Sequence, residues 1–299
     1  MAKVPGLSEW LYVPRAWYEA DPVALQARAD FVLLYEKGSA QQIAEALEAI
    51  WAMLDRAALW VSSIHTELAS LSSGFVEGTR AVLLPTIPRQ MRALAHLGRA
   101  SLDYLPAGMA AARSAFESGV RLAWVDAPQD PHERVARILS LHNVESRWKR
   151  TVATDFGFDE AAAERWRQAA DVQAALVARA QDAIGWEDRL PRVASVKDQL
   201  HELNLDRLYP GYRLASEYVH GGLTSALEVE AIRAEHSPFG AYWPSDWFLA
   251  MSMCAWACNF AGQYASAGFN PGPLRGVMLA AELLLLSPEP GWRPGASGQ

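Results

Sequence analysis

The segment DPHERVARILSLHNVESRWKRTVATDFGFD, residues 130–159, decides the fold class of this chain. It opens on a helix N-cap residue, Asp130, followed by Pro131 at the first helical position, where proline is favoured. The apolar residues that follow recur at the three- and four-residue spacing of an amphipathic helix. Gly157 ends this helix and Asp159 caps a second one. The segment therefore predicts two consecutive long helices.

Similar helix signals recur along the rest of the chain, and no alternating strand pattern of any length accompanies them. Further helices are predicted to begin near Pro22, Ser39, Pro106, Ser195, Pro210 and Ser245, with a last helix that ends near Leu286. Pro85 and Pro88 are predicted to break the helical pattern between two of them. The sequence thus predicts an all-α fold, a multi-helix bundle of about ten helices.

No linker separates two halves of the chain, so we expect one compact unit. Within it we distinguish an N-terminal helical extension over residues 1–87 and a helical domain over residues 88–286. Residues 287–299 are rich in Pro, Gly and Ser and are predicted to be a disordered tail.

Composition excludes several classes of protein. The 299 residues are 51% apolar and 20% charged, which is ordinary for a folded chain and argues against general disorder. Two cysteines are too few for a disulfide scaffold. Because 27 basic and 34 acidic residues give a net charge of −7, nucleic acid would have to bind a local basic patch.

The sequence also predicts where the protein works. Its first 20 residues contain a lysine and two prolines and lack the apolar run of a signal peptide. No stretch reaches the roughly 18 apolar residues of a membrane-spanning helix. We therefore expect a cytoplasmic protein without membrane association.

A first candidate motif is Arg113-Ser-Ala-Phe-Glu117-Ser-Gly-Val-Arg121-Leu-Ala-Trp124. On a helix, Arg113 and Glu117 share one face with the bulky apolar residues Phe116 and Trp124. Charged groups that point into a core need paired partners, so this pair requires further polar contacts. It is either a buried ion pair that fixes helix packing or part of a functional site.

A second candidate motif is Tyr212-Arg213-Leu-Ala-Ser216-Glu217-Tyr-Val-His220. Four of its polar side chains follow one another along one stripe of a helix: Arg213, Ser216, Glu217 and His220. His220 precedes two glycines, which places it near a helix C-terminus. A histidine beside an arginine can serve as an acid–base and phosphate-holding pair, although a histidine at a helix end is more often a cap. Both motifs need polar partners beside an apolar face, so we predict that their helices pack together.

Other candidates are weaker. Cys254 and Cys258 lie four residues apart on an apolar helix, and we expect them to be free thiols packed in the protein interior. The histidines show no metal-ligand spacing, and there is no Gly-rich phosphate loop or GxSxG motif, so no metal or cofactor is predicted. The basic residues of the helix that begins at Pro131 indicate a solvated face or, as a minor alternative, a strip that contacts RNA.

Taken together, the two motifs and the intervening segment 124–134 resemble a family of uncharacterised bacterial all-helical domains, over residues 88–230. The spacing of Arg213 and His220 also falls within the R-x4-6-H signature of HEPN domains, which implies a HEPN-like core. Active HEPN members are metal-independent ribonucleases that usually dimerise. In that resemblance Arg213, His220, Ser216 and Glu217 are catalytic, and Arg113, Glu117 and Tyr212 support them.

The resemblance leaves two functions open. One is an HEPN-like endoribonuclease or toxin of a bacterial stress or antiphage system, with RNA as substrate, a homodimer as the active form and a partner protein from a defence operon. The other is a non-catalytic binding or scaffold protein whose Arg, Glu, Ser and His side chains form a buried polar network. Leu214, where active HEPN members carry a polar residue, favours the second.

Overall fold

The computed structural model describes residues 40–71, 80, 82–186, 189–220 and 247–262. These residues form eight α-helices and two short 3-10 helices, and none of them lies in a strand. The all-α prediction is confirmed, while the number of helices in this part of the chain is below the predicted ten. The helices predicted over residues 22–38 and up to Leu286, and the predicted tail, lie outside the described residues.

The chain divides into two compact units, which are described here one at a time. The first comprises the described residues up to Leu122 and from Asn204 onward, and the second comprises Ala123–Leu203. The boundary falls inside a helix, α7 (Leu105–Asp126).

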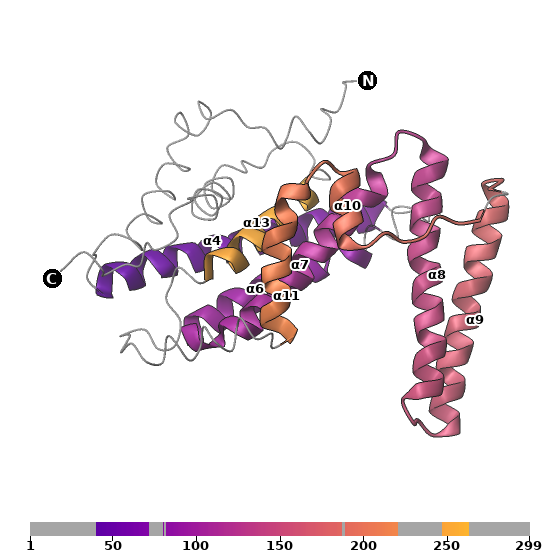
Figure 1. The fold of residues 1–299 in the computed structure, drawn as a ribbon, viewed down its shortest axis with the longest axis horizontal. Helices are drawn as coiled ribbons and strands as arrows, with labels where there is room; N and C mark the ends of the chain where they lie inside the picture. The colour runs from indigo at the N-terminus through magenta and orange to yellow at the C-terminus, as the bar shows by residue number, and fades with distance from the viewer. Residues whose placement is uncertain (1–39, 72–79, 81, 187–188, 221–246, 263–299) are drawn as a thin grey trace. The chain divides into compact units, whose positions relative to one another are not determined.

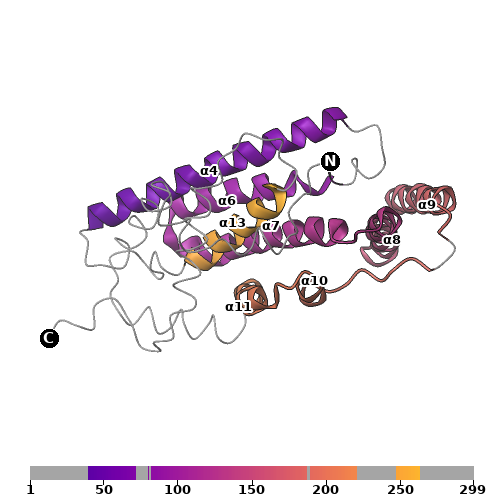
Figure 2. The ribbon, with the colours of Figure 1, turned by 90° about the horizontal axis from the view of Figure 1, so that it is seen from above.

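The described part of the first unit consists of helices (Figures 1 and 2). They are α4 (Ala40–Leu71), α6 (Thr86–Ala100), α7 (Leu105–Asp126), α11 (Tyr209–His220) and α13 (Phe248–Gly262), with the 3-10 helices η1 (Leu102–Tyr104) and η2 (Asp206–Leu208). In Figure 2, α4, α6, α13 and α7 run side by side, and α7 contacts both α6 and α13. Apolar side chains from all four are buried between them.

Glycines allow the helices of the first unit to approach closely. A Cβ added at Gly98 on α6 would lie 2.3 Å from the Trp51 ring on α4. A Cβ added at Gly119 on α7 would lie 2.9 Å from the backbone of Ala257 on α13. Real side chains do not tolerate such distances, so these glycines set the spacing between helices.

Helix α13 lies at the centre of this core. Its described side chains from Leu249 to Phe260 are buried, apart from a half-buried Asn259. A helix that is apolar around most of its circumference has to be covered on all sides, and other helices of the first unit contact α13. Cys254 and Cys258 are free thiols in this interior, as expected for packed cysteines, and burial raises the pKa of both.

The second unit contains a long antiparallel helix pair, α8 (Pro131–Asp155) and α9 (Glu160–Ala183), and a short helix, α10 (Val196–Glu202) (Figure 1). The predicted caps are present, because the carboxylates of Asp130 and Asp159 accept hydrogen bonds from the first turns of α8 and α9. Gly157 adopts a φ of +64° between the two helices, a conformation that favours glycine.

One local prediction was wrong. Pro88 does not break the helical pattern, because α6 begins at Thr86 and accommodates Pro88 in its first turn. Proline is tolerated there since the first backbone N–H groups of a helix have no partner within it. None of the helices in the described ranges is long and apolar enough to cross a membrane.

Candidate functional site

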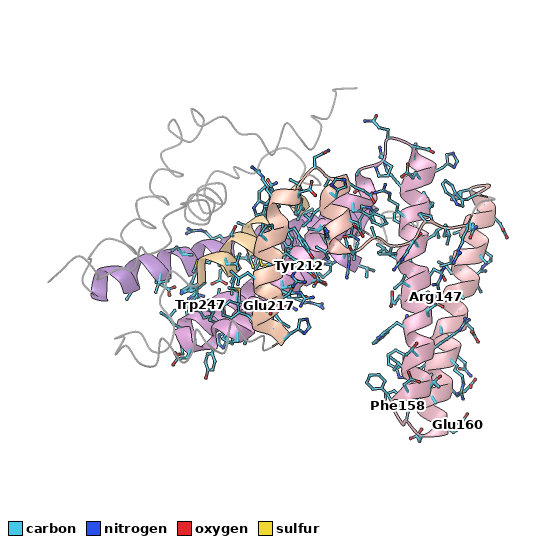
Figure 3. The ribbon with its side chains drawn as sticks, in the orientation of Figure 1. Arg147, Phe158, Glu160, Tyr212, Glu217 and Trp247 are labelled. Carbon is cyan, nitrogen blue, oxygen red and sulfur yellow. The ribbon has the colours of Figure 1, made fainter. Side chains whose placement is uncertain are left out.

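The two sequence motifs meet where α7 and α11 contact each other in the first unit. Phe116 of α7 stacks on Tyr212 of α11, with ring centroids 6.2 Å apart, and also contacts Phe260 of α13. Tyr209 stacks on the Tyr212 ring at 6.1 Å. Figure 3 shows Tyr212 and Glu217 projecting from α11. These aromatic contacts fix α11 so that its polar side chains reach the Arg113 motif.

Arg113 is the centre of this polar cluster and makes three hydrogen bonds. Its Nε donates to Glu117 Oε1 at 2.9 Å, and its Nη2 donates to the Tyr212 hydroxyl at 3.1 Å. Its Nη1 lies 3.1 Å from Nε2 of His220. We call Arg113, Glu117, Tyr212 and His220 the arginine cluster. It joins residues that lie up to 107 positions apart in the chain, as predicted from their shared need for polar partners.

The contact with Arg113 determines the form of His220. A guanidinium has only donors, so Nε2 of the imidazole accepts this hydrogen bond. This hydrogen bond corresponds to the tautomer of His220 that carries its proton on Nδ1. His220 is exposed at the end of α11, which leaves the imidazole accessible to a ligand.

Glu117 connects the members of the arginine cluster as a shared hydrogen-bond acceptor. Its Oε1 accepts a 2.9 Å hydrogen bond from the Tyr212 hydroxyl as well as the bond from Arg113, and its Oε2 lies 3.5 Å from Arg121. The side chains of Arg113 and Glu117 are only 21% and 20% exposed. Such a network holds the arginine in one orientation.

The network also sets the charge of its members. Burial raises the pKa of Tyr212, and the neighbouring Glu117 carboxylate raises it further, so the phenol stays protonated. Burial lowers the pKa of Arg113, but its contacts with Tyr212 and Glu117 outweigh this, and the net pKa is raised. Arg113 is thus a permanent cation beside the His220 imidazole.

The remaining predicted site residues lie elsewhere on α11. Arg213 is 61% exposed and pairs with Glu217 at 3.5 Å. The Ser216 hydroxyl donates to the Tyr212 carbonyl at 2.9 Å. In the residues that the structure describes, His220 contacts Arg113 and makes no hydrogen bond with Arg213. The arginine beside the histidine therefore comes from the neighbouring helix.

Sequence reasoning did not assign a role to Arg121 or Tyr209. Arg121 lies four residues after Glu117 on α7, a spacing that brings two helical side chains together. Tyr209 lies three residues before Tyr212 on α11, so the same rule could have indicated its contact. Both complete the surroundings of the arginine cluster.

The middle segment of the resemblance has a structural role. Arg137 stacks over the Trp124 ring at 4.5 Å and donates to its carbonyl, while Glu202 accepts from the Trp124 indole at 2.8 Å. Arg134 donates to the Pro128 carbonyl at 2.6 Å. These contacts tie the segment that precedes α8 to the second unit.

The cluster can do acid–base chemistry next to a fixed positive charge. A neutral imidazole can take a proton, and a guanidinium can bind a phosphate through two parallel hydrogen bonds. No group of three or more His, Cys, Asp or Glu side chains in the described part of the chain is arranged to hold a metal ion.

Comparison with known proteins finds a similarity in the part of the chain that contains the arginine cluster. A search of curated proteins and a search of solved structures find no match to this chain. The expected resemblance to an uncharacterised family, over residues 88–230, lies inside the range of a match to a family model. Residues 85–232 of the chain, which hold both motifs of the arginine cluster, are similar to the "Family of unknown function (DUF5677)".

Proposed function

We propose that the arginine cluster cleaves RNA without a metal ion, as in an HEPN-like endoribonuclease or toxin of a bacterial defence system. The observation that carries this proposal is the 3.1 Å contact between Arg113 Nη1 and His220 Nε2. It brings a fixed cation and an exposed imidazole together, which are two groups that can promote cleavage of a phosphodiester by a ribose hydroxyl.

The proposed step starts when a phosphate of the RNA takes the Nη1 hydrogen bond that His220 accepts in the free protein. Nε2 of His220 is then free to accept the proton of the ribose 2′-hydroxyl. The 2′ oxygen forms a bond to phosphorus, the bond from phosphorus to the 5′ oxygen breaks, and that oxygen takes a proton from water. The products are a 2′,3′-cyclic phosphate and a 5′-hydroxyl.

Each neighbour has a role in this proposal. Arg113 stabilises the negative charge that develops on the phosphate, and Glu117 and Tyr212 hold its guanidinium in place. Arg213 is an exposed cation on the same helix and can contact a neighbouring phosphate of the strand. Ser216 and Glu217 position Tyr212 and Arg213 through their hydrogen bonds. From the HEPN resemblance we further propose that the active form is a homodimer and that a protein from a defence operon is its partner.

The experiment uses the purified full chain and a fluorescent single-stranded RNA in buffer with EDTA. We expect cleavage, with 2′,3′-cyclic phosphate ends identified by mass spectrometry, and no cleavage of the matching DNA, which lacks the 2′-hydroxyl. Expression in bacteria should also slow growth, and His220→Ala should relieve this. Intact RNA after incubation with the protein, alone and with its genetic neighbours, would contradict the proposal.

A second candidate function is a scaffold in which the cluster only fixes the fold. It is favoured by the fact that each nitrogen of the Arg113 guanidinium already has a partner within the protein. The two candidates differ in what His220→Ala changes. If His220 is catalytic, its replacement at an exposed helix end should leave the stability of the protein unchanged. If His220 is structural, the same replacement should lower the stability.

A further inference from the structure

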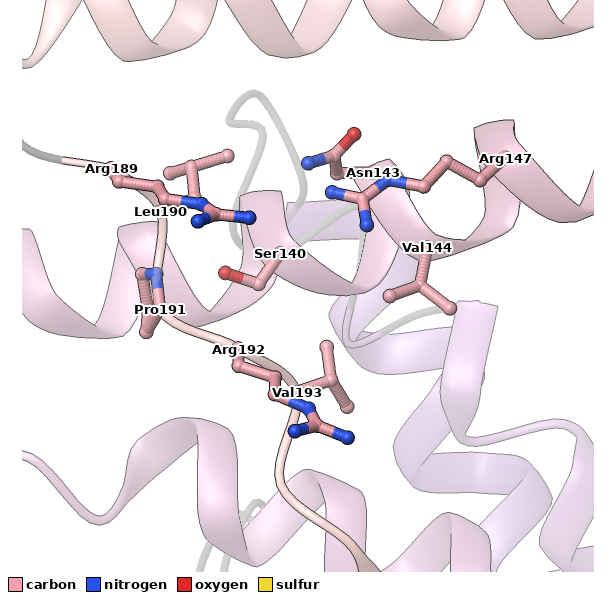
Figure 4. Close-up of a pocket in the computed structure, with 9 residues that line it drawn as sticks. All are labelled: Ser140, Asn143, Val144, Arg147, Arg189, Leu190, Pro191, Arg192 and Val193. Carbon is pink, nitrogen blue, oxygen red and sulfur yellow. The ribbon is translucent and has the colours of Figure 1, made fainter.

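The second unit contains a cavity that lies apart in sequence from the arginine cluster. It has a volume of about 560 Å³ and lies between α8 and the segment from Arg189 to Val193 (Figure 4). Nine of the described residues line it: Ser140, Asn143, Val144, Arg147, Arg189, Leu190, Pro191, Arg192 and Val193. Its volume falls within the roughly 300–1,000 Å³ typical of small-ligand sites.

Arg147 differs from the other cations of α8. Four of the five have acceptors within the protein: Arg134 with the Pro128 carbonyl, Arg137 with Glu133, Lys149 with Glu145 and Arg150 with Asp171. Arg147, the fifth, has no ion pair with any described residue and lines the cavity. Arg147 is thus the one Arg or Lys of α8 for which the structure shows no hydrogen-bond acceptor among the described residues.

Arg189 and Arg192 add two further positive charges. Neither forms an ion pair within the described part of the chain, and the nine lining residues include no carboxylate. In Figure 4 the side chains of Arg147 and Arg189 extend toward each other from opposite sides of the cavity. All three arginines are exposed, so their guanidinium groups are open to solvent and can attract an anion with several negative charges.

The rest of the lining suits an organic group attached to such an anion. Val144, Leu190, Pro191 and Val193 give the cavity an apolar part, and Asn143 offers an amide that can both donate and accept. Guanidinium groups match the geometry of phosphate oxygens in pairs of hydrogen bonds. The ligand that fits has a short chain of phosphates at one end and a small organic body at the other.

We propose that this cavity binds a nucleoside di- or triphosphate, with its phosphates on Arg147, Arg189 and Arg192 and its nucleoside against the apolar residues. The proposal does not depend on RNA cleavage by the arginine cluster, because each rests on different residues. The phosphates contact the arginines directly, so binding needs no divalent cation.

Isothermal titration calorimetry of the full chain tests this with ATP, GTP, CTP and UTP, and with inorganic triphosphate, all in EDTA. At least one nucleotide should bind, and more tightly than triphosphate. Arg147→Gln, Arg189→Gln and Arg192→Gln should each weaken binding by about tenfold or more, as expected for the loss of a charged hydrogen bond. The matched control is Arg150→Gln on the same helix, whose cation pairs with Asp171 instead, and it should bind within about twofold of the unaltered protein.

Several results would overturn the proposal. They are the absence of binding by all four nucleotides, equal binding of triphosphate and nucleotide, or binding that appears only with Mg²⁺. Cavity variants that bind as tightly as Arg150→Gln would also overturn it. A single-stranded RNA decamer that binds the cavity arginines and that nucleotides do not displace would assign the cavity to nucleic acid instead. Circular dichroism of each variant shows that lost binding is not lost folding.

Discussion

Arg113 Nη1 lies 3.1 Å from His220 Nε2, although the two residues are 107 positions apart in the chain. The contact forms where α7 and α11 meet, and Arg113 also donates to Glu117 on its own helix and to Tyr212 on α11. Of the three partners of Arg113 in the arginine cluster, only His220 is exposed.

Replacing Glu117 should destabilise the protein. Glu117→Ala removes the acceptor shared by Arg113 and Tyr212. We expect a loss of about 2–3 kcal/mol in the free energy of unfolding, below the roughly 3–5 kcal/mol of fully buried pairs, since both partners of the ion pair stay about one-fifth exposed. Urea denaturation followed by circular dichroism measures it. Asp171→Ala, which removes an exposed ion pair in the second unit, is the control and should cost under about 1 kcal/mol. Equal losses for the two variants would contradict the account.

His142 should make stability depend on pH. Burial lowers its pKa below the usual 6.5, with Glu145 opposing and Lys149 adding to this shift, and the Gln173 amide donates to its Nδ1. The unfolded chain then binds the proton more readily than the folded one, so stability falls as pH decreases below 6.5 toward the folded pKa.

Urea unfolding at pH 7.5 and pH 5 checks this expectation. The unaltered protein should lose more stability between these two values than His142→Gln, which carries no titrating group at this position. A variant that loses the same amount, or a protein that gains stability on acidification through this range, would show that His142 is not responsible.

Gly98 should not tolerate a side chain. In Gly98→Ala the new methyl group would meet the Trp51 ring, which is itself buried, so one of the two helices has to shift. Overpacking of this kind costs about 1–3 kcal/mol. Gly211→Ala, where the nearest atom is 3.1 Å away on Leu249, is the milder comparison. Thermal unfolding of both variants should show the larger decrease in Tm for Gly98→Ala, and the reverse order would be inconsistent with the packing of α4 on α6.

The thiols of Cys254 and Cys258 should be unreactive in the folded protein. Both are fully buried on α13, and burial raises the pKa of each, so the reactive thiolate is rare. A thiol reagent such as DTNB should leave both unmodified in buffer and modify both in guanidinium. Rapid modification under native conditions would show that α13 is not a central helix.

The fold was largely predictable because its signals are local. Asp130, Asp159 and Ser195 each lie directly before the first residue of a helix and cap it. Such a cap depends only on neighbouring residues in the sequence. The start of α6 was mispredicted, because Pro88 looks like a breaker until its place in the first turn is known.

The candidate site was predictable only in part. Burial required partners for Arg113 and for Tyr212, and this predicted that α7 and α11 meet. Spacing along α11 pointed to Arg213 as the arginine beside His220, whereas Arg113 occupies that place. Which of two arginines faces a histidine depends on how the helices pack, and no spacing within one helix contains that information. The same holds for the cavity of Arg147 and Arg189, which forms between a helix and a loop.

The most direct test of the central claim is the rate of RNA cleavage by His220→Ala, measured beside its free energy of unfolding. If His220 is the general base, the variant should cleave about 10²–10⁴-fold more slowly. Because His220 is an exposed residue at a helix end, its unfolding free energy should stay within about 1 kcal/mol of the unaltered protein. Unchanged cleavage by the variant, or a loss of stability that accounts for the lost activity, would contradict the claim.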